Sequence, residues 1–175
     1  PDVVVVRMYL PGELPPQSWS IDTVALALAA GKIVLPIFWL YSTFSAVDSV
    51  QQALDLARRA ELAPKFLLGD FETYNPTGHK VEDPGPTTAQ IREAVAECQS
   101  QGVELIPYTG VWWLQGYLPD YAEFAGLHVW LEQYNNVPDL DSVTMPVGWP
   151  RERLWGHQYS ADGVDMDVFD ARIAA

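Results

Sequence analysis

Residues 65–72, KFLLGDFE, carry the clearest structural signal in the sequence. Their apolar run predicts a buried strand, and the stretch ends in two acids separated by one position. Side chains at i and i+2 of a strand point to the same face, so we expect Asp70 and Glu72 to project together, roughly 7 Å apart at Cα. Both acids lie at the carboxyl end of the predicted strand, which is where α/β sheets and barrels place their active sites.

Other apolar runs alternate with amphipathic segments on both sides of this strand. Further strands are predicted at residues 3–9, 33–40, 104–109, 127–134, 154–159 and 164–169. Helices are predicted from Ser20 to Gly31, from Ser45 to about Leu62, and from Thr87 to just before Gly102, with the Ser and Thr residues as N-caps. The alternation predicts one α/β domain over residues 1–175 with a mostly parallel sheet, open or closed into a barrel. The later half has fewer helices, which argues against a regular eight-helix barrel.

The composition excludes several classes of function. The chain has 10 Lys plus Arg and 23 Asp plus Glu, so its formal net charge is −13. Nucleic-acid binding needs clustered cations, and the few basic residues here are scattered. No apolar run approaches the ~20 residues that span a bilayer, so we expect no membrane partner. A single cysteine, Cys98, excludes a cysteine-based zinc site, and three separated histidines offer no ligand pair, so we predict no metal and no cofactor.

The acidic pair at residues 70 and 72 indicates glycosidase chemistry. Two neighbouring carboxylates repel each other when both are ionised, which raises the proton affinity of at least one. A carboxylic acid that stays protonated can protonate a glycosidic oxygen, while an adjacent carboxylate stabilises the oxocarbenium ion. The alternative is that the acids begin a solvated loop. Asp165 and Asp167 repeat the spacing in the last predicted strand, where the alternative is a surface strand with alternating acids.

Aromatic side chains near the predicted strand ends are candidates for sugar binding, because aromatic faces stack on the C–H faces of pyranose rings. Core packing is the alternative for each of them. The predicted substrate contacts, which include one neutral amide for hydrogen bonding, are Trp39, Tyr108, Trp113, Tyr134 and Gln158.

In order along the chain, these motifs resemble those of glycoside hydrolase family 25, the Chalaropsis-type lysozymes or N-acetylmuramidases of bacteria and many phage endolysins. The matching segments are VVVVRMYLPG (3–12), residues 30–39, LLGDFE (67–72), LIPYTGVWW (105–113), VWLEQY (129–134) and WGHQYSADGVDMDVF (155–169). The resemblance implies an irregular TIM-like α/β barrel with mostly parallel strands and fewer than eight helices. It also implies that Glu72 is the general acid, that Asp70 stabilises the transition state or the reacting substrate amide, and that Asp165 completes the cleft.

The family cleaves the β-1,4 bond between N-acetylmuramic acid and N-acetylglucosamine with retention, so the resemblance implies peptidoglycan as the partner and the bacterial cell wall, outside the cell, as the place of action. The family's first strand carries Asp-x-Ser and has no match here, so we expect an excised domain whose first strand lies upstream or is lost. The alternative hypothesis is a non-catalytic wall- or glycan-binding module on the same scaffold, in a phage tail or structural protein. Gram-positive walls are anionic, so the charge of −13 predicts that another domain or subunit targets the wall.

Overall fold

Strands and helices alternate in the first unit of the chain, Pro1–Leu105, as the sequence pattern predicts. The computed structural model describes residues 2–9, 18–73, 83–160 and 165–174. The elements of this unit are β1 (Val3–Tyr9), α1 (Ser18–Ala29), β2 (Ile33–Trp39), α2 (Ala46–Arg59), β3 (Phe66–Asp70) and α3 (Thr88–Ser100), followed by the start of β4 (Glu104–Gly110). A second unit comprises Ile106–Ala175, and the single domain over residues 1–175 stays a prediction.

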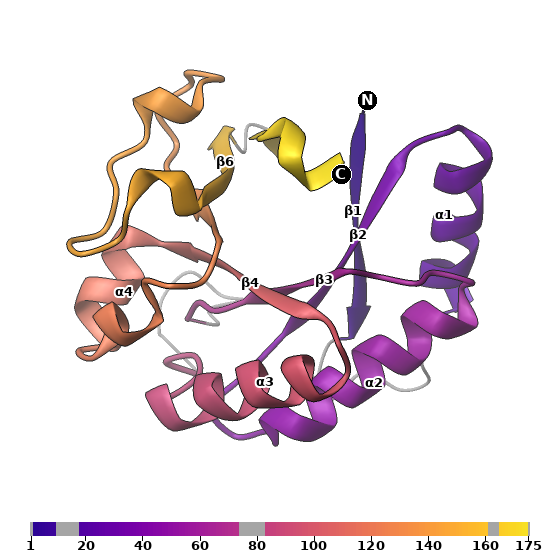
Figure 1. Cartoon of the computed structure of the whole chain (residues 1–175), viewed down its shortest axis with the longest axis horizontal. Helices are drawn as coiled ribbons and strands as arrows, with labels where there is room; N and C mark the ends of the chain where they lie inside the picture. Colours follow the sequence, from indigo (N-terminus) through magenta and orange to yellow (C-terminus); the bar gives the residue numbers. More distant parts are fainter. Residues whose placement is uncertain (1, 10–17, 74–82, 161–164, 175) are drawn as a thin grey trace. The chain divides into compact units, whose positions relative to one another are not determined.

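Strands β1, β2 and β3 form a parallel sheet in that order. Helices α1 and α2 pack against β1 and β2, and α3 lies beside α2 (Figure 1). Alternation along the strands gives the sheet one wholly apolar face and one face that also carries polar groups. The most buried members of the apolar face are Val6, Met8, Phe38, Leu67 and Phe71. The opposite face is the one on which Trp39 and Asp70 lie.

The helix starts at Ser45 and Thr87 are confirmed. Ser45 is the N-cap of α2, and its hydroxyl accepts a hydrogen bond from the Asp48 amide at 3.2 Å. Thr87 and Gln90 form a reciprocal capping box at the start of α3, with bonds of 3.3 Å and 2.9 Å. Each cap satisfies amide groups that the first turn of a helix leaves without partners.

Helix α1 begins earlier than predicted. It starts at Ser18, and Ser20 lies inside it, where the Ser20 hydroxyl donates to the Arg7 carbonyl at 2.8 Å instead of capping the helix. The predicted end is confirmed, because Gly31 follows α1 with φ of +69°, and Gly102 follows α3 with φ of +70°. Glycine tolerates this left-handed conformation without the steric penalty of a Cβ.

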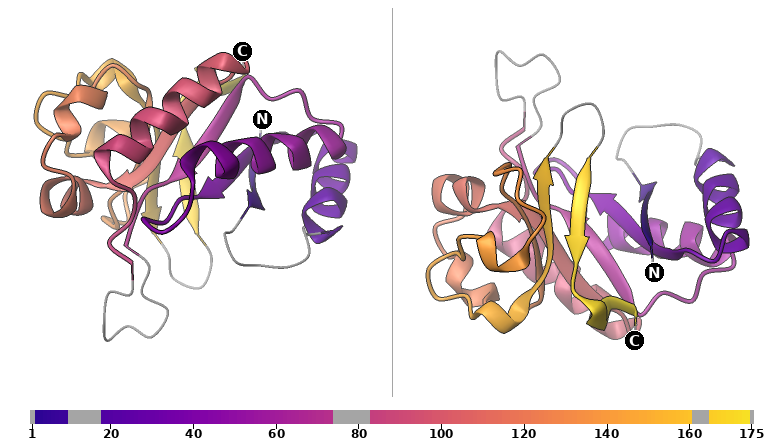
Figure 2. Two further views of the ribbon diagram at one scale, coloured as in Figure 1. Left: turned by 90° about the horizontal axis from the view of Figure 1, so that it is seen from below. Right: turned by 90° about the horizontal axis from the view of Figure 1, so that it is seen from above.

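The second unit has shorter elements. They are the rest of β4, α4 (Val111–Tyr117), β5 (Val129–Glu132), β6 (Leu154–Ser160) and β7 (Met166–Phe169), with 3-10 turns η1 (Tyr121–Phe124), η2 (Leu140–Ser142), η3 (Arg151–Arg153) and η4 (Ala171–Ala174). Strands β4, β5 and β6 are parallel, whereas β7 runs antiparallel to β6 (Figure 2). The short link between β6 and β7 explains this direction, since a parallel crossover needs a dozen or more residues. Helix α4 was not predicted, because seven residues carry too little periodic signal.

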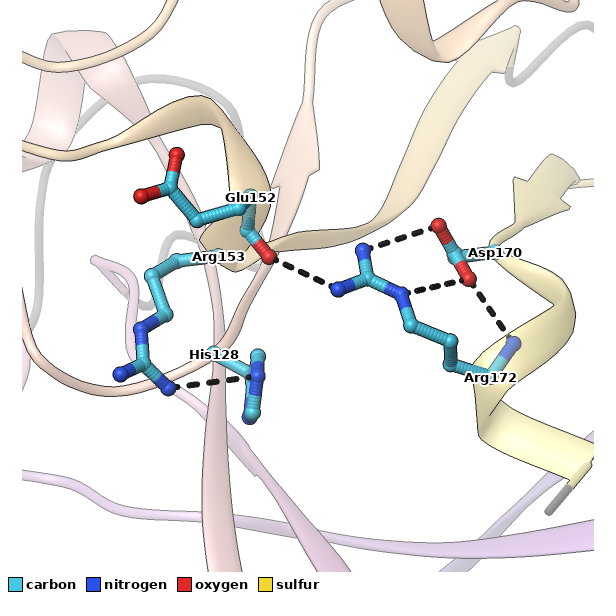
Figure 3. Close-up of polar contacts among 5 residues, drawn as sticks. All are labelled: His128, Glu152, Arg153, Asp170 and Arg172. Carbon is cyan, nitrogen blue, oxygen red and sulfur yellow. Dashed lines mark hydrogen bonds and ion pairs between the residues drawn. The ribbon is translucent and has the colours of Figure 1, made fainter.

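The 3-10 turn η4 contacts residues near the amino end of β6 through Arg172. Arg172 donates to both oxygens of Asp170 at 2.8 and 2.9 Å and to the Glu152 carbonyl at 3.1 Å (Figure 3). Its guanidinium also lies 6.0 Å from the centre of the Trp155 ring and holds the pKa of Asp170 below its ordinary value. These contacts lie at the end of β6 opposite to the candidate site, so we assign them to stability.

Candidate active site

Two acids at the end of β3 are the candidate catalytic residues of the first unit. The strand ends at Asp70, so Glu72 lies two residues beyond it and not within the strand as predicted. Both side chains are half-buried. Phe71 is 1% exposed, and a Cβ on Gly69 would lie 2.6 Å from its ring, so Gly69 and Phe71 share one face. The strand-like alternation therefore continues to Phe71, with Asp70 on the opposite face.

Trp39 lies beside the first of these acids. The register of β2 and β3 pairs Trp39 with Asp70, so their side chains are neighbours on one face of the sheet. The Arg7 guanidinium carbon lies 5.5 Å from the centre of the Trp39 ring, and the Tyr41 ring lies 6.2 Å from it, edge to face. Arg7 was not among the predicted site residues. The signal that could have found it is a single cation in a valine-rich strand, because buried charges are rare unless they are paired.

Residues 41–44, which follow β2, are held by two side chains from other parts of the first unit. Asp83 is 7% exposed and accepts hydrogen bonds from the Ser42 amide at 3.0 Å and the Ser42 hydroxyl at 2.8 Å. The Gln90 amide nitrogen donates to the carbonyls of Ser42 at 3.1 Å and Phe44 at 2.8 Å. The same glutamine caps α3, so the helix start and the end of β2 are fixed together.

A hydrogen-bonded group occupies the ends of three parallel strands in the second unit. Tyr108, Glu132 and Gln158 come from β4, β5 and β6, share one face by register, and are at most 9% exposed. The Tyr108 hydroxyl donates to Gln158 Oε1, and the Tyr134 hydroxyl donates to Glu132 Oε2 at 2.7 Å and to Gln158 Oε1 at 3.1 Å. The structure thus brings together three predicted sugar-binding residues. Glu132 was not among the predicted site residues. The signal that could have indicated it is an acid in an otherwise apolar strand.

The two adjacent tryptophans of α4 have opposite environments. Trp113 is 0% exposed, so the structure corrects its proposed role as a substrate contact and assigns it to the core. Trp112 is 51% exposed, and its indole N–H donates to Glu132 Oε1. The sequence offered no means of choosing between them, because the helix was not recognised and its facing was unknown.

Two aspartates accompany the last strand. Asp165 is exposed and directly precedes β7, whereas Asp167 lies on β7 opposite Gln158 and is half-buried. Burial, with the added repulsion of Asp165, raises the pKa of Asp167 to about 7, although the nearby Trp130 indole N–H offsets part of this effect. Asp167 was noted in the sequence only as the companion of Asp165. The second unit therefore holds a carboxyl group that exchanges its proton near neutral pH.

The described residues contain no group of three or more His, Cys, Asp or Glu side chains that could hold a metal ion. Cys98 is fully buried, and burial raises the pKa of its thiol to about 12, so it is not a ready nucleophile.

Within the part of the chain that the structure describes, no helix is both long enough and apolar enough to cross a membrane. The reactive groups that remain at the strand ends are carboxylic acids, which are suited to proton transfer and to the stabilisation of positive charge.

Mostly parallel strands, an antiparallel last strand and four α-helices in the described residues define an irregular α/β barrel class. Solved structures share this fold. The catalytic domain of endolysin Ply40, from a bacteriophage of Listeria monocytogenes, has a TM-score of 0.66 and 16% identity over 98% of this chain and 83% of its own. GHIP, a glycosyl hydrolase 25 of Streptococcus pneumoniae, has a TM-score of 0.64 and 14% identity over 96% and 76%.

The modular Cpl-1 endolysin, solved with a peptidoglycan analogue, has a TM-score of 0.63 and 12% identity over 96% of this chain. The chain spans only 47% of Cpl-1 and 58% of the CTP1L endolysin. The sequence matches no protein-family model and no curated protein. The solved structures confirm, at the level of the fold, the resemblance to glycoside hydrolase family 25.

Proposed function

We propose that this chain is a peptidoglycan-cleaving lysozyme of the N-acetylmuramidase type, which hydrolyses the β-1,4 bond between N-acetylmuramic acid and N-acetylglucosamine with retention. The observation that carries the proposal is the position of Asp70 and Glu72, half-buried at the carboxyl end of β3, in a fold shared with the glycosyl hydrolase 25 GHIP and with the endolysin Ply40. Cpl-1 was solved with a peptidoglycan analogue, and LytC with a synthetic peptidoglycan ligand. Both complexes support a glycan-strand substrate and action at the bacterial cell wall.

In the proposed mechanism, Glu72 donates its proton to the glycosidic oxygen as the bond to the leaving sugar breaks. Asp70 stabilises the positive charge that develops at the reacting sugar, or orients the substrate's acetamido group for attack on the anomeric carbon. Attack by that group and then by water inverts the centre twice, which accounts for retention without a protein nucleophile. Asp165, which directly precedes β7 in the second unit, is the third proposed catalytic acid.

The remaining proposed contacts are neutral. Trp39, beside Asp70, and Tyr134 offer ring faces to the sugar. The buried Tyr108 and Gln158 hydrogen-bond to each other, and Gln158 also holds the Tyr134 hydroxyl at the edge of this contact. Wall targeting is assigned to another domain or subunit, because the net charge of −13 repels an anionic wall. Sedimentation of the isolated 175 residues with purified walls at moderate salt would contradict that assignment.

The test is turbidity clearing of purified peptidoglycan by the wild type and by Glu72→Gln, with Glu93→Gln as the control because Glu93 is exposed on α3. Loss of a general acid is expected to slow clearing by about 10²–10⁴-fold, and the control is expected to match the wild type. Mass spectrometry of the products should show new N-acetylmuramic acid reducing ends. Equal clearing by the wild type and Glu72→Gln would rule out the assigned acid. Glycan binding by the wild type without any cleavage would favour the non-catalytic module.

A further inference from the structure

Two half-exposed aromatic rings in the second unit are anchored through their polar atoms to one buried carboxylate. Trp112 is 51% exposed and Tyr134 is 54% exposed, whereas Glu132 between them is only 9% exposed. The Trp112 indole N–H donates to Glu132 Oε1, and the Tyr134 hydroxyl donates to Glu132 Oε2 at 2.7 Å. Each oxygen of the carboxylate therefore fixes one ring.

The backbone is built to allow this arrangement. A Cβ on Gly110 would lie 2.5 Å from Trp112 Cδ1 and 2.6 Å from Glu132 Oε1, so any side chain there would force the ring and the carboxylate apart. Gln158 supports the other side of the group, because it is 3% exposed and accepts from the Tyr134 hydroxyl at 3.1 Å. The polar atoms of both rings are thus directed into the protein.

Since their polar atoms are engaged inward, the rings offer apolar surface to a ligand. An exposed aromatic surface with fixed orientation suits the C–H face of a pyranose ring, and pre-ordered rings lose little conformational entropy on binding. We propose that Trp112 and Tyr134 form a stacking subsite for β-1,4-linked acetamido sugars, with Glu132 as its positioning residue. This inference rests on the proposed function, because it assigns a subsite for the substrate class that the proposed function names.

Substituting Glu132 in two ways separates positioning from catalysis. In Glu132→Gln the amide oxygen can accept from the Trp112 N–H, while the amide nitrogen donates to the Tyr134 hydroxyl, whose own proton then goes to Gln158 Oε1. All the anchoring bonds survive without the charge. Glu132→Ala removes both anchors and leaves the rings free to rotate.

The binding test is calorimetry with a β-1,4-linked N-acetylglucosamine tetrasaccharide, carried out in the Glu72→Gln background so that the ligand stays intact. Trp112→Ala and Tyr134→Ala are each expected to weaken binding by about three- to ten-fold, the range of a single aromatic contact. Glu132→Ala should fall in the same range and Glu132→Gln within about two-fold of the background. Leu26→Ala, which removes an exposed apolar side chain from α1, is the control and should bind like the background.

The kinetic test uses peptidoglycan and the otherwise unaltered protein. Glu132→Ala should raise KM with little change in kcat, and Glu132→Gln should leave both near the wild-type values. Unweakened binding by both Trp112→Ala and Tyr134→Ala would overturn the subsite, even if the protein cleaves peptidoglycan. A hundred-fold loss of kcat in Glu132→Gln would overturn the positioning role. Tetrasaccharide binding that depends on Trp112, in a protein that cleaves nothing, would support the subsite and reject the lysozyme.

Discussion

The strand ends of the two units carry different chemistry. In the first unit, β2 and β3 end with an indole and two half-buried acids, and Arg7 lies over the same indole. In the second unit, β4, β5 and β6 end in a network in which Tyr108, Glu132 and Gln158 satisfy one another. The comparison shows that the proposed general acid and its neighbouring carboxylate lie in the first unit, whereas the second unit combines a buried hydrogen-bonded network with two half-exposed rings. Substitutions of Asp70 and Glu72 should therefore change kcat, and those in the network and rings of the second unit should change binding or stability.

The largest expected effect is the loss of stability in Trp113→Ala. This side chain is 0% exposed, and removal of a buried tryptophan leaves a cavity that costs about 3–5 kcal/mol of unfolding free energy. Trp112→Ala should cost only about 1 kcal/mol, because that ring is half exposed and its loss admits water to Glu132. Urea unfolding gives both values from the midpoints, provided that the m-value is unchanged. A greater loss in Trp112→Ala than in Trp113→Ala would reverse the assigned core and surface roles.

The next effect is on catalysis by the first unit. Asp70→Asn keeps the shape of the side chain but removes its charge, so kcat for peptidoglycan should fall about 10²-fold, equivalent to about 2.7 kcal/mol. Tetrasaccharide binding should change by less than about two-fold, since the aromatic contacts remain. Asp22→Asn is the matched control, because Asp22 is exposed on α1. If Asp70→Asn weakened binding and left kcat unchanged, the assignment of Asp70 to the reaction and not to ligand binding would be wrong.

The first unit was predictable from sequence because its signals are local. A continuous apolar run marks β1 and β3, and the capping residues Ser45 and Thr87 lie one position before α2 and α3. Such signals depend on residues within one helical turn or one strand. The error at Ser20 has the same physical origin: its hydroxyl donates to a carbonyl 13 positions away, which no local pattern reveals.

The second unit was less predictable because its arrangement depends on long-range contacts. The Tyr108–Gln158 hydrogen bond joins residues 50 positions apart. Glu132 meets Tyr108 and Gln158 only because β4 and β6 lie on either side of β5. Trp113 is buried and Trp112 is half exposed, and which of the two is buried depends on which side of the seven-residue helix α4 packs against the core. Tyr134 and Gln158 were identified from residue type and a family motif, and the sequence did not show that they share a hydrogen bond.

A smaller effect concerns the ionisation of Asp167 in the second unit. Folding raises the pKa of Asp167 from its ordinary value of 3.8 to about 7, so the folded state keeps a proton that the unfolded state releases between these values. Stability should therefore fall as pH rises from about 4 to about 7, and the full penalty should be present above pH 7. Asp167→Asn removes the penalty, so it should gain about 1–2 kcal/mol over the wild type at pH 8, after allowance for the partial exposure of the group.

At about pH 3.5, where Asp167 is largely protonated in the folded and unfolded states alike, the same substitution should be nearly neutral. Urea unfolding of the wild type and Asp167→Asn at several pH values measures the difference directly. Asp165→Asn is an informative companion, because removal of the neighbouring charge should lower the pKa of Asp167 without abolishing the effect. A stability difference that stays constant from pH 3.5 to pH 8 would show that Asp167 ionises normally.

The smallest effect tests whether the helices of the first unit contribute stability alone. Thr87→Ala breaks a reciprocal capping box and should cost about 1 kcal/mol, whereas Ser45→Ala removes one 3.2 Å bond and should cost somewhat less. Clearing of peptidoglycan at 25 °C should be unchanged in Ser45→Ala, because α2 carries none of the proposed catalytic groups. Thr87→Ala is the more sensitive probe, since its partner Gln90 also holds the carbonyls of Ser42 and Phe44 beyond β2. A fall in kcat for Thr87→Ala without one for Ser45→Ala would show that the start of α3 positions the strand end beside Asp70.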